Sequence, residues 1–595
     1  MIFEPFIFGT AILIIALTGD LFGIEVILIS LAALLCFRTR AFAGTWFETA
    51  ERLGCRIAER KWTASLVAGA AAIVLRLALL PWVPVPHAVI SDEFSHLLIA
   101  DTFAHGRLAN PAHPLWRSFE TLQVNQQPTY SSMYFPGPGL LLFLGQIVTG
   151  VPWAGLLLTM GLLCGAICWA LQGWMPARWA FLGGLLAALK FGLESYWINS
   201  YWGGASGALG GALVLGALPR IRKNPSVGVS ITMATGIVLL ATSRPWEGLA
   251  LCLPVCVSLA AWLLASNRIR FSAKLTRFVI PALACLLVAG AGLCVYFNAV
   301  TGSPTVLPYV VHQQAYGWPL TLPWTSIDYV QHSRREFAEY LAYEMNERMN
   351  FTSWIRYAKS LSTKIEVDWR FFFGPALTIP LLFVPQFWRN RRLRFLFFTG
   401  AVSLVVVLTE PHFPHYLSPV TLAAAALWVQ GMRHLRLWRR TRDQAGLRLS
   451  RAIPVVLALV VVAQVVASSS GVKTSKLAGY TSWCCSNPGI VDQPSIVERL
   501  PRFGKHLILV RYHGSHFFGD EWVFNAADID SARVVWAKEL GGDQDRRLIN
   551  YFNDRQVWLF EPDLQPPKLA PLAPAVTLQV PGSRNGTDRA ITVKN

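Results

Sequence analysis

The chain has 595 residues, of which 53% are hydrophobic, and its mean hydropathy is +0.42. Charged residues make up 14%, well below the roughly 25% that is usual in a soluble domain. Apolar runs long enough to cross a bilayer recur along the chain. This composition excludes a soluble globular protein and predicts a polytopic helical membrane protein.

The net charge of +18 would also fit a nucleic-acid-binding protein, but the basic residues gather in short links between apolar segments. This is the distribution of the positive-inside rule, so the links are predicted to face the cytoplasm. Contact with anionic lipids is a second interpretation of the same charges. The clusters lie at residues 220–223, 268–277, 389–394 and 433–451.

The first 61 residues are predicted to form an N-terminal unit with two parts. Residues 5–36 are apolar around Gly19 and Asp20, which fits either one long span or a hairpin. Residues 37–61 are polar and basic and are expected in the cytoplasm. The start of the chain lacks the basic region and the cleavage site of a secretory signal peptide, so none is expected.

Residues 62–470 are predicted to form the transmembrane domain. The first run, residues 62–82, crosses outward and leads into an external loop over 83–136. Residues 137–150 are short for a span, and treating them as an interfacial helix keeps every later basic link in the cytoplasm. The fold class is therefore an all-α polytopic membrane protein with about 11–13 transmembrane helices. Later spans are expected near 153–172, 178–194, 203–219, 226–243, 248–266, 276–298, 370–388, 395–409, 416–432 and 452–470, with a second long external loop over 299–369.

Residues 471–595 change in character and are predicted to form a small external α/β domain. Residues 507–512 and 555–563 have the β-branched and aromatic composition of strands. Residues 528–540 are predicted to form an amphipathic helix, and residues 546–552 a second helix. From Pro562 onward the chain is rich in proline and polar residues, which predicts a flexible end.

Most of the ten cysteines lie in or beside apolar segments, as Cys164 and Cys168 do, and are predicted to be small core residues. Cys484 and Cys485 lie in the external tail. A vicinal disulfide, an intermolecular bridge and two thiols all remain open for this pair.

An acidic pair, Asp92 and Glu93, stands where the chain leaves the membrane. Ionisable groups at a membrane edge are costly unless they pair or act, so this pair is the first candidate for chemistry. The alternative is an N-terminal helix cap, because carboxylates in a first helical turn are favoured by the helix dipole. Glu93 and His96 at i, i+3 spacing could also ligate a divalent metal, although two ligands do not make a site.

The residues after the acidic pair follow an order that is typical of one family of membrane enzymes. The helix closes on His105-Gly106-Arg107-Leu108, and an aromatic segment, Tyr134-Phe135-Pro136, precedes the juxtamembrane helix. With the acidic pair, this order resembles the GT-C superfamily of membrane glycosyltransferases, and within it the protein O-mannosyltransferase and lipid A aminoarabinose transferase group. The likeness in layout covers residues 62–432. One departure is Pro136 to Leu140, which stands where that group carries a lysine-containing turn.

The resemblance implies a glycosyltransferase that moves a sugar from a polyprenyl-phosphate donor to an acceptor hydroxyl on the external face of a bacterial plasma membrane. Asp92 would match the catalytic base, and Glu93 would orient the acceptor or bind a metal. Inverting transfer needs a carboxylate at the acceptor oxygen and positive charge at the leaving phosphate. The acceptor would be a lipid, a glycan or a protein, and a divalent metal is the one cofactor considered.

Candidates for the phosphate and sugar contacts lie at other external helix ends. Arg244 is the first candidate, because arginine matches phosphate oxygens bidentately; its alternative role is a membrane anchor paired with Glu247. His412, His415 and Tyr416 form a second group, with an interfacial aromatic belt as the alternative. His96, Tyr134, Glu194, Tyr196 and Asn199 complete the predicted substrate contacts.

Glycines at 203, 204, 207, 210 and 211 recur at small-residue spacing, and close helix packing explains them.

Two other functions compete with sugar transfer. A transporter or flippase for a polyprenyl-linked glycan should show polar groups at mid-membrane or paired repeats, and the candidate residues instead lie at external helix ends. A membrane scaffold whose external tail is the working part is the other alternative. It has the least support, because that tail has no recognisable catalytic pattern.

Overall fold

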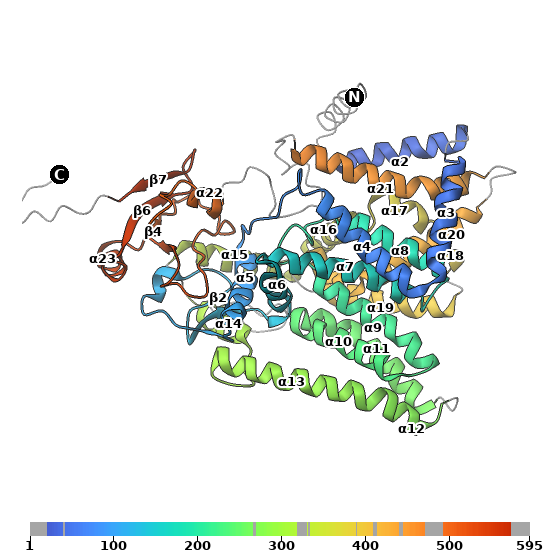
Figure 1. Cartoon of the computed structure of the whole chain (residues 1–595), viewed down its shortest axis with the longest axis horizontal. Helices are drawn as coiled ribbons and strands as arrows, with labels where there is room; N and C mark the ends of the chain where they lie inside the picture. Colours follow the sequence, from blue (N-terminus) through green and yellow to red (C-terminus); the bar gives the residue numbers. More distant parts are fainter. Residues whose placement is uncertain are drawn as a thin grey trace, which may run out of the picture.

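The computed structural model describes residues 21–39, 42–265, 269–317, 330, 332, 334–387, 390–408, 413–438, 444–469 and 492–572. Within these ranges the chain forms a helical bundle, a small sheet domain at the other end of the molecule, and a layer of shorter elements between them (Figure 1). His412, the pair Cys484 and Cys485, and residues 1–20 of the predicted N-terminal span or hairpin lie outside the described residues.

The bundle is built from helices joined mostly by short links. They are α2 (Leu21–Arg38), α3 (Thr45–Glu59), α4 (Lys61–Ala78), α7 (Pro152–Leu171), α8 (Ala177–Phe191), α9 (Ala205–Lys223), α10 (Val227–Ser243), α11 (Pro245–Ala265), α12 (Phe271–Lys274), η2 (Leu275–Val279), α13 (Ile280–Thr301), α16 (Trp354–Phe372), α17 (Gly374–Leu381), α18 (Val384–Phe387), α19 (Arg391–Val407), η4 (Pro414–Val420), α20 (Thr421–Leu437) and α21 (Ala445–Ser469).

The mostly helical, multi-span membrane class predicted from the sequence is confirmed. Among the described residues, 6 helices are long and apolar enough to cross a membrane, or 7 when one bent pair is counted as a span. The predicted number was higher because several apolar runs form shorter helices. Examples are α8 with 15 residues, and α10 and α19 with 17 residues each.

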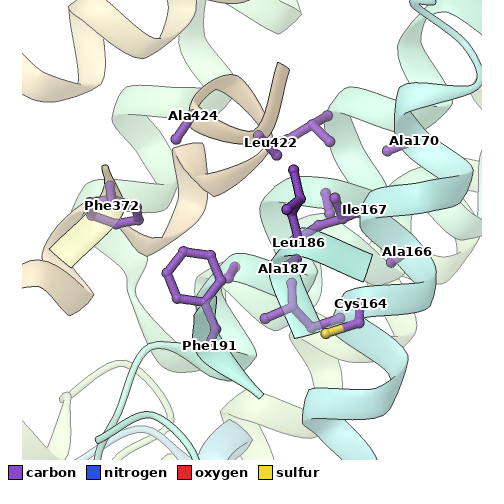
Figure 2. Close-up of a cluster of buried hydrophobic side chains, with 14 of the residues drawn as sticks. Cys164, Ala166, Ile167, Ala170, Leu186, Ala187, Phe191, Phe372, Leu422 and Ala424 are labelled. Atoms are coloured by element: carbon purple, nitrogen blue, oxygen red, sulfur yellow. The ribbon is translucent and has the colours of Figure 1, made fainter. Parts of the chain in front are cut away.

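The core of the bundle lies between α7, α8, α16 and α20. Cys164 and Ile167 of α7 face Leu186 of α8, and Phe372 and Leu422 close the same cluster from the other side (Figure 2). Cys164 and Cys168 are fully buried, so the predicted role as small core residues is confirmed for these two, whereas Cys55, Cys256 and Cys294 are exposed and do not fit it. Ala166, Ala170 and Ala187 of the same cluster have small side chains, which let α7 and α8 approach closely and gain van der Waals contact.

The predicted single span over residues 370–388 is wrong. The helix α16 begins earlier, at Trp354, and the chain bends by 93° before α17. Gly374 takes a positive φ of 63°, and Pro375 follows at the start of α17. Glycine tolerates this conformation, and proline at the first helical turn lacks only an N–H that has no helical partner. Glu25 of α2 accepts the backbone N–H of Ala376 at 2.9 Å and so caps the new helix.

The middle layer comes from the two predicted external loops. Its first part contains α5 (Ser91–Ala104), β1 (Asn110–Pro111), η1 (Trp116–Phe119), β2 (Val124–Asn125), β3 (Thr129–Ser132) and α6 (Pro136–Thr149). Its second part contains α14 (Pro308–Tyr316), α15 (Arg335–Met349) and η3 (Asn350–Thr352). The three short strands form a sheet in the order β1-β3-β2. α6 has 14 residues, which agrees with a helix too short to span.

The tail is the small mixed α/β domain that the sequence predicted. It contains α22 (Gln493–Val497), β4 (Lys505–Val510), β5 (Val534–Lys538), α23 (Gly542–Tyr551), β6 (Arg555–Glu561) and β7 (Lys568–Pro571). The strand order is β5-β4-β6-β7, with β4 parallel to both of its neighbours. The strands at 507–512 and 555–563 and the helix at 546–552 are confirmed.

Two details of the tail were predicted wrongly. Residues 528–540 contain the strand β5 in place of an amphipathic helix. Val534 and Val535 carry the β-branched side chains that suit a strand, and the side chain of Asn525 pairs with both backbone groups of Trp536 at 2.8 and 2.9 Å. This pairing covers part of the free edge of the sheet. The predicted flexible end also contains β7, which pairs antiparallel with β6.

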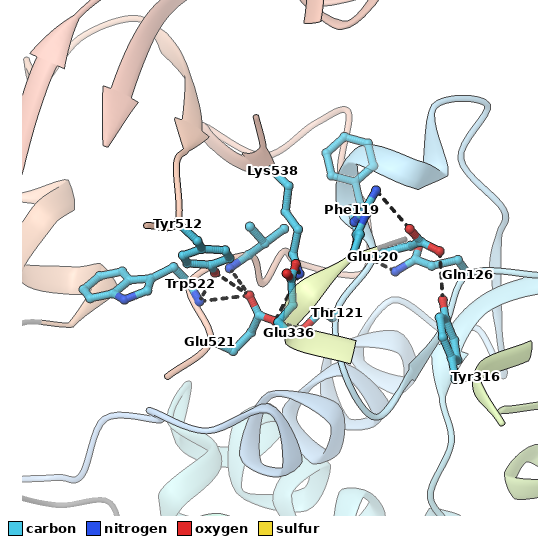
Figure 3. Close-up of polar contacts among 12 residues, drawn as sticks. Phe119, Glu120, Thr121, Gln126, Tyr316, Glu336, Tyr512, Glu521, Trp522 and Lys538 are labelled. Carbon is cyan, nitrogen blue, oxygen red and sulfur yellow. Dashed lines mark hydrogen bonds and ion pairs between the residues drawn. The ribbon is translucent and has the colours of Figure 1, made fainter. Parts of the chain in front are cut away.

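The tail packs directly on the middle layer. Phe524 stacks on Phe94 of α5 with ring centroids 4.4 Å apart, and the backbone N–H of Ala527 donates to Asp101 of the same helix at 2.7 Å. Thr121 donates to the buried Glu521 at 2.6 Å, and Lys538 pairs with Glu336 of α15 at 2.7 Å (Figure 3). Helix α5 is therefore held between the bundle and the tail.

Candidate active site

The acidic pair lies at the first turn of α5, and its two members have different surroundings. Glu93 is fully buried, and its carboxylate accepts the backbone N–H groups of Val89 at 2.9 Å, Ile90 at 3.3 Å and Tyr201 at 3.0 Å. Burial raises the pKa of Glu93 to about 7, although these hydrogen bonds oppose the rise. Glu93 thus closes the start of α5 and ties it to the link between α8 and α9.

Asp92 points to a different set of side chains. Its Oδ1 atom accepts a short hydrogen bond from the hydroxyl of Tyr134. Burial raises the pKa of Asp92 above its usual value, while the Tyr134 hydrogen bond and the positive charge of Arg244 act in the opposite direction. A carboxylate with a raised pKa is a stronger base than an exposed one, and it acts as a base once it is ionised.

His96 lies one helical turn after Asp92 and packs on the same tyrosine. The rings of His96 and Tyr134 stack with centroids 4.6 Å apart. Burial and the nearby charge of Arg244 lower the pKa of His96 to about 3, so its imidazole is neutral at physiological pH. Its Nδ1 atom is buried and makes no hydrogen bond to the described residues.

Arg244 lies in the link between α10 and α11, and two neighbours, Tyr416 and Glu247, contact its guanidinium. Its guanidinium lies over the ring of Tyr416 at 4.7 Å from the centroid and approaches Glu247 at 3.4 Å. The cation–π contact orients the guanidinium plane without using its N–H donors, which leaves them able to meet an anion. The side chain of Arg244 is 22% exposed, so a ligand can reach it.

Glycines bring the separate elements of this site together. A Cβ atom on Gly137, at the start of α6, would come within 2.5 Å of Thr242, two residues before Arg244. A Cβ atom on Gly139 would come within 2.4 Å of Ile99 on α5. The departure from the lysine-containing turn at Pro136 to Leu140 therefore has a packing reason: this turn lies between the helix of Asp92 and the helix end of Arg244.

The glycines at the start of α9 have the same effect on η4. A Cβ atom on Gly207 would come within 2.5 Å of Ser418, and one on Gly211 within 1.8 Å of the carbonyl oxygen of Pro419. The predicted role of these glycines in close packing is confirmed. Their absence of side chains lets the segment with His415 and Tyr416 lie against α9, next to Arg244.

The sequence-predicted residues fall into two groups around this site. Asp92, His96, Tyr134, Arg244 and Tyr416 interact with one another as described above. Tyr196 is buried behind them, where its hydroxyl hydrogen-bonds to Nδ1 of His415 at 3.0 Å. His415 is itself 1% exposed and packs edge-on against Trp202 with centroids 4.6 Å apart.

Glu194 and Asn199 belong to a neighbouring buried cluster around Arg76 of α4. The Nη2 atom of Arg76 donates to Asn199 Oδ1 at 2.9 Å, and the Arg76 guanidinium lies 4.8 Å from the Trp153 ring. The same guanidinium donates to the carbonyl oxygens of Val83 at 2.9 Å and Pro84 at 3.1 Å. This cluster fixes the chain where it turns from α4 toward Asp92, so these two residues support the site from behind.

Sequence reasoning missed the contribution of α15. Glu344 is buried, and the hydroxyl of Tyr340 donates to its Oε1 atom at 2.9 Å. Burial raises the pKa of Glu344 to about 7, and the negative charges of Glu347 and Asp92 add to the rise. The segment predicted as the second external loop therefore brings another carboxylate within electrostatic reach of Asp92. The only signal in the sequence was the density of Tyr and Glu between residues 336 and 347.

A divalent metal at this site gains no support from the geometry. Both oxygens of Glu93 already accept backbone N–H groups. Within the described residues, no group of three or more His, Cys, Asp or Glu side chains could hold a metal ion.

No protein-family model and no curated protein matches the chain. Solved structures of membrane glycosyltransferases are similar to it at low sequence identity. ArnT from Cupriavidus metallidurans bound to undecaprenyl phosphate has a TM-score of 0.45 and 12% identity, and the alignment covers 83% of this chain and 92% of ArnT. The archaeal oligosaccharyltransferase AglB from Archaeoglobus fulgidus, in complex with an inhibitory peptide and a dolichol-phosphate, has a TM-score of 0.42 and 10% identity, over 84% of this chain and 69% of AglB.

Proposed function

We propose that this chain is a membrane glycosyltransferase of the GT-C type, which transfers a sugar from a polyprenyl-phosphate donor to an acceptor hydroxyl on the external face of the membrane. The observation that carries the proposal is the convergence of Asp92, Tyr134 and Arg244 from three separate elements. A partly buried carboxylate within electrostatic reach of a partly exposed guanidinium supplies both a base and a phosphate-binding cation.

In this proposal Asp92 accepts the proton of the acceptor hydroxyl as its oxygen attacks the anomeric carbon. The bond between that carbon and the donor phosphate oxygen breaks, and polyprenyl phosphate leaves with its negative charge beside Arg244. The Tyr134 hydroxyl holds the Asp92 carboxylate in place. Tyr416 does the same for Arg244, because its ring faces the guanidinium.

Supporting roles in this proposal fall to Glu93, His415, Tyr196 and Asn199. Asn199 accepts a hydrogen bond from Arg76 and so helps to fix the chain that leads to Asp92. Glu93 positions Asp92 by fixing the first turn of α5, and the hydrogen bond between Tyr196 and His415 fixes the segment that carries Tyr416. His96 is neutral and stacks on Tyr134 beside Asp92, where it would offer a polar contact to the acceptor or the sugar.

The test is a donor-cleavage assay with the purified full chain. The chain is mixed with a panel of undecaprenyl-phosphate hexoses and pentoses and with total membrane lipids, glycans and proteins as acceptors. Released undecaprenyl phosphate and labelled acceptor are then measured by mass spectrometry. We expect release with at least one donor, and a loss of about 10²- to 10⁴-fold in kcat for Asp92→Asn, the range for removing a positioned base.

Glu93→Gln is the matched control for Asp92→Asn, because both changes convert a carboxylate to a carboxamide in the same helical turn. Glu93→Gln should retain more activity than Asp92→Asn, since Glu93 contacts backbone groups only. Equal activity of Asp92→Asn and the unmodified chain would remove the base assignment. Movement of labelled donor across vesicle membranes without release of undecaprenyl phosphate would favour the flippase alternative.

A further inference from the structure

A concave site lies at the opposite end of the bundle from Asp92. It has a volume of about 970 Å³ and lies where α4 begins and where α7 and α9 end. An 18-residue helix such as α4 rises about 27 Å, so the two sites are separated by roughly the thickness of the hydrocarbon core. The pocket is lined by Lys61, Trp62, Trp169, Gln172, Gly173, Trp174, Leu218, Pro219, Arg220, Arg222, Lys223 and Phe395.

The wall of this pocket is built around two breaks in helical hydrogen bonding. Pro219 has no N–H, so the carbonyl oxygen of Leu215 one turn earlier loses its helical partner; the indole N–H of Trp174 donates to it instead at 3.0 Å. At the end of α7, Arg220 donates to the carbonyl oxygen of Trp169 at 2.5 Å and lies 4.0 Å from the ring of the same residue. Arg220 and Trp174 are thereby held rigidly against the pocket.

The pocket is strongly cationic, and part of that charge is available to a ligand. Four lining residues, Lys61, Arg220, Arg222 and Lys223, are basic, and the lining contains no Asp or Glu among the described residues. Arg222 donates to Ser258 at 3.1 Å. The ammonium groups of Lys61 and Lys223, by contrast, are exposed and make no hydrogen bond or ion pair within the described part of the chain.

Aromatic rings form the apolar side of the same pocket. Trp62 is 73% exposed at the start of α4, and the rings of Trp174 and Phe395 stack in parallel with centroids 6.5 Å apart. Tryptophan at the end of a membrane helix lies at the level of the lipid headgroups. The pocket therefore meets the bilayer at the level where a phosphate ester joins its acyl chains.

We propose that this pocket binds an anionic glycerophospholipid of the cytoplasmic leaflet. The phosphodiester would lie between Lys61 and Lys223, near Arg220, and the acyl chains would extend along Trp62 and Phe395. The volume is in the range of about 300–1,000 Å³ that is common for small-molecule sites, and basic pockets between membrane helices on the cytoplasmic side suit such headgroups. The inference does not depend on the proposed transferase activity.

The test is native mass spectrometry of the purified full chain titrated with dioleoylphosphatidylglycerol and, separately, with the zwitterionic dioleoylphosphatidylcholine. We expect preferential retention of phosphatidylglycerol. The double variant Lys61→Gln/Lys223→Gln should weaken this binding by roughly ten- to thirtyfold, since each cation near an anionic lipid contributes a factor of about five.

The matched control is Arg56→Gln/Arg178→Gln, which removes two exposed charges from α3 and α8 outside the pocket lining. This control should bind phosphatidylglycerol like the unmodified chain. An equal loss in both double variants would show a general charge effect and overturn the site. Equal retention of both lipids, or displacement of phosphatidylglycerol by millimolar inorganic phosphate, would overturn the lipid assignment.

Discussion

An arginine packs on an aromatic ring at both ends of the helical bundle. At one end Arg244 lies over Tyr416, and at the opposite end Arg220 lies over Trp169. Arg244 lies within electrostatic reach of the Asp92 carboxylate, whereas the lining of the pocket around Arg220 contains no acidic residue among those described. The cation–aromatic pair suits an anionic ligand at either end, but of these two described sites only the one at Arg244 also has a carboxylate.

The donors of the two arginines are used differently as well. The Nη1 and Nη2 atoms of Arg220 donate to main-chain carbonyl oxygens at 2.6 and 2.5 Å. Arg244 has one long contact, with Glu247 at 3.4 Å, and its cation–π contact with Tyr416 uses none of its N–H donors. We therefore expect Arg244 to contact ligand phosphate directly, and Arg220 mainly to shape the wall around Lys61 and Lys223.

Two variants at the Arg244 site test this comparison, and Arg244→Gln is expected to have the larger effect on donor binding. Loss of a charge-assisted contact to phosphate should raise the donor KM by about ten- to a hundredfold. The same change removes a positive charge that lowers the pKa of Asp92, so the acid limb of the pH–rate profile should move to higher pH. Steady-state kinetics across pH measures both.

The control for that variant is Arg117→Gln. Arg117 is an exposed arginine that lies 5.5 Å from the ring of Trp116 in the same external layer. Its removal should leave the donor KM and the pH profile unchanged. If Arg117→Gln and Arg244→Gln behave alike, Arg244 acts through general surface charge and not through a donor site.

A smaller effect is expected for Glu344→Gln. Because the pKa of Glu344 is about 7, its side chain is neutral below pH 7 and gains a negative charge above it. That charge would repel the anionic phosphate, so donor binding should weaken by a few-fold as the pH rises from 6 to 8. Glu344→Gln is neutral throughout and should show a smaller decline, because the only part that remains is due to other groups such as Glu93, whose pKa is also about 7. A decline of the same size in the variant and in the unmodified chain would show that Glu344 does not cause it.

The sequence was most informative where chemistry and local structure coincide. The acidic pair at a predicted membrane edge made Asp92 a candidate, the positions of single arginines and tyrosines at helix ends did the same for Arg244 and Tyr416, and the fold brings these residues together. The hydrogen-bond partners of Glu93 could not be predicted, because they include the backbone of Tyr201, more than a hundred residues away.

Long-range packing also explains the errors. Residues 528–540 have a pattern that suits an amphipathic helix, yet β5 forms because β4 and Asn525 provide a sheet edge for its backbone. The bend after α16 depends on Glu25, which caps α17 from a distant helix. Glu344 was missed for the same reason: only the folded second loop brings α15 to Asp92.

The most direct measurement of the central claim is a cryo-EM map of the full chain with undecaprenyl phosphate. The proposed mechanism predicts phosphate density against the guanidinium of Arg244, above Tyr416, with the Asp92 carboxylate facing the space where the sugar would be attached. Phosphate density bound away from Arg244, with the ligand confined to the pocket around Lys61 and Lys223, would contradict it.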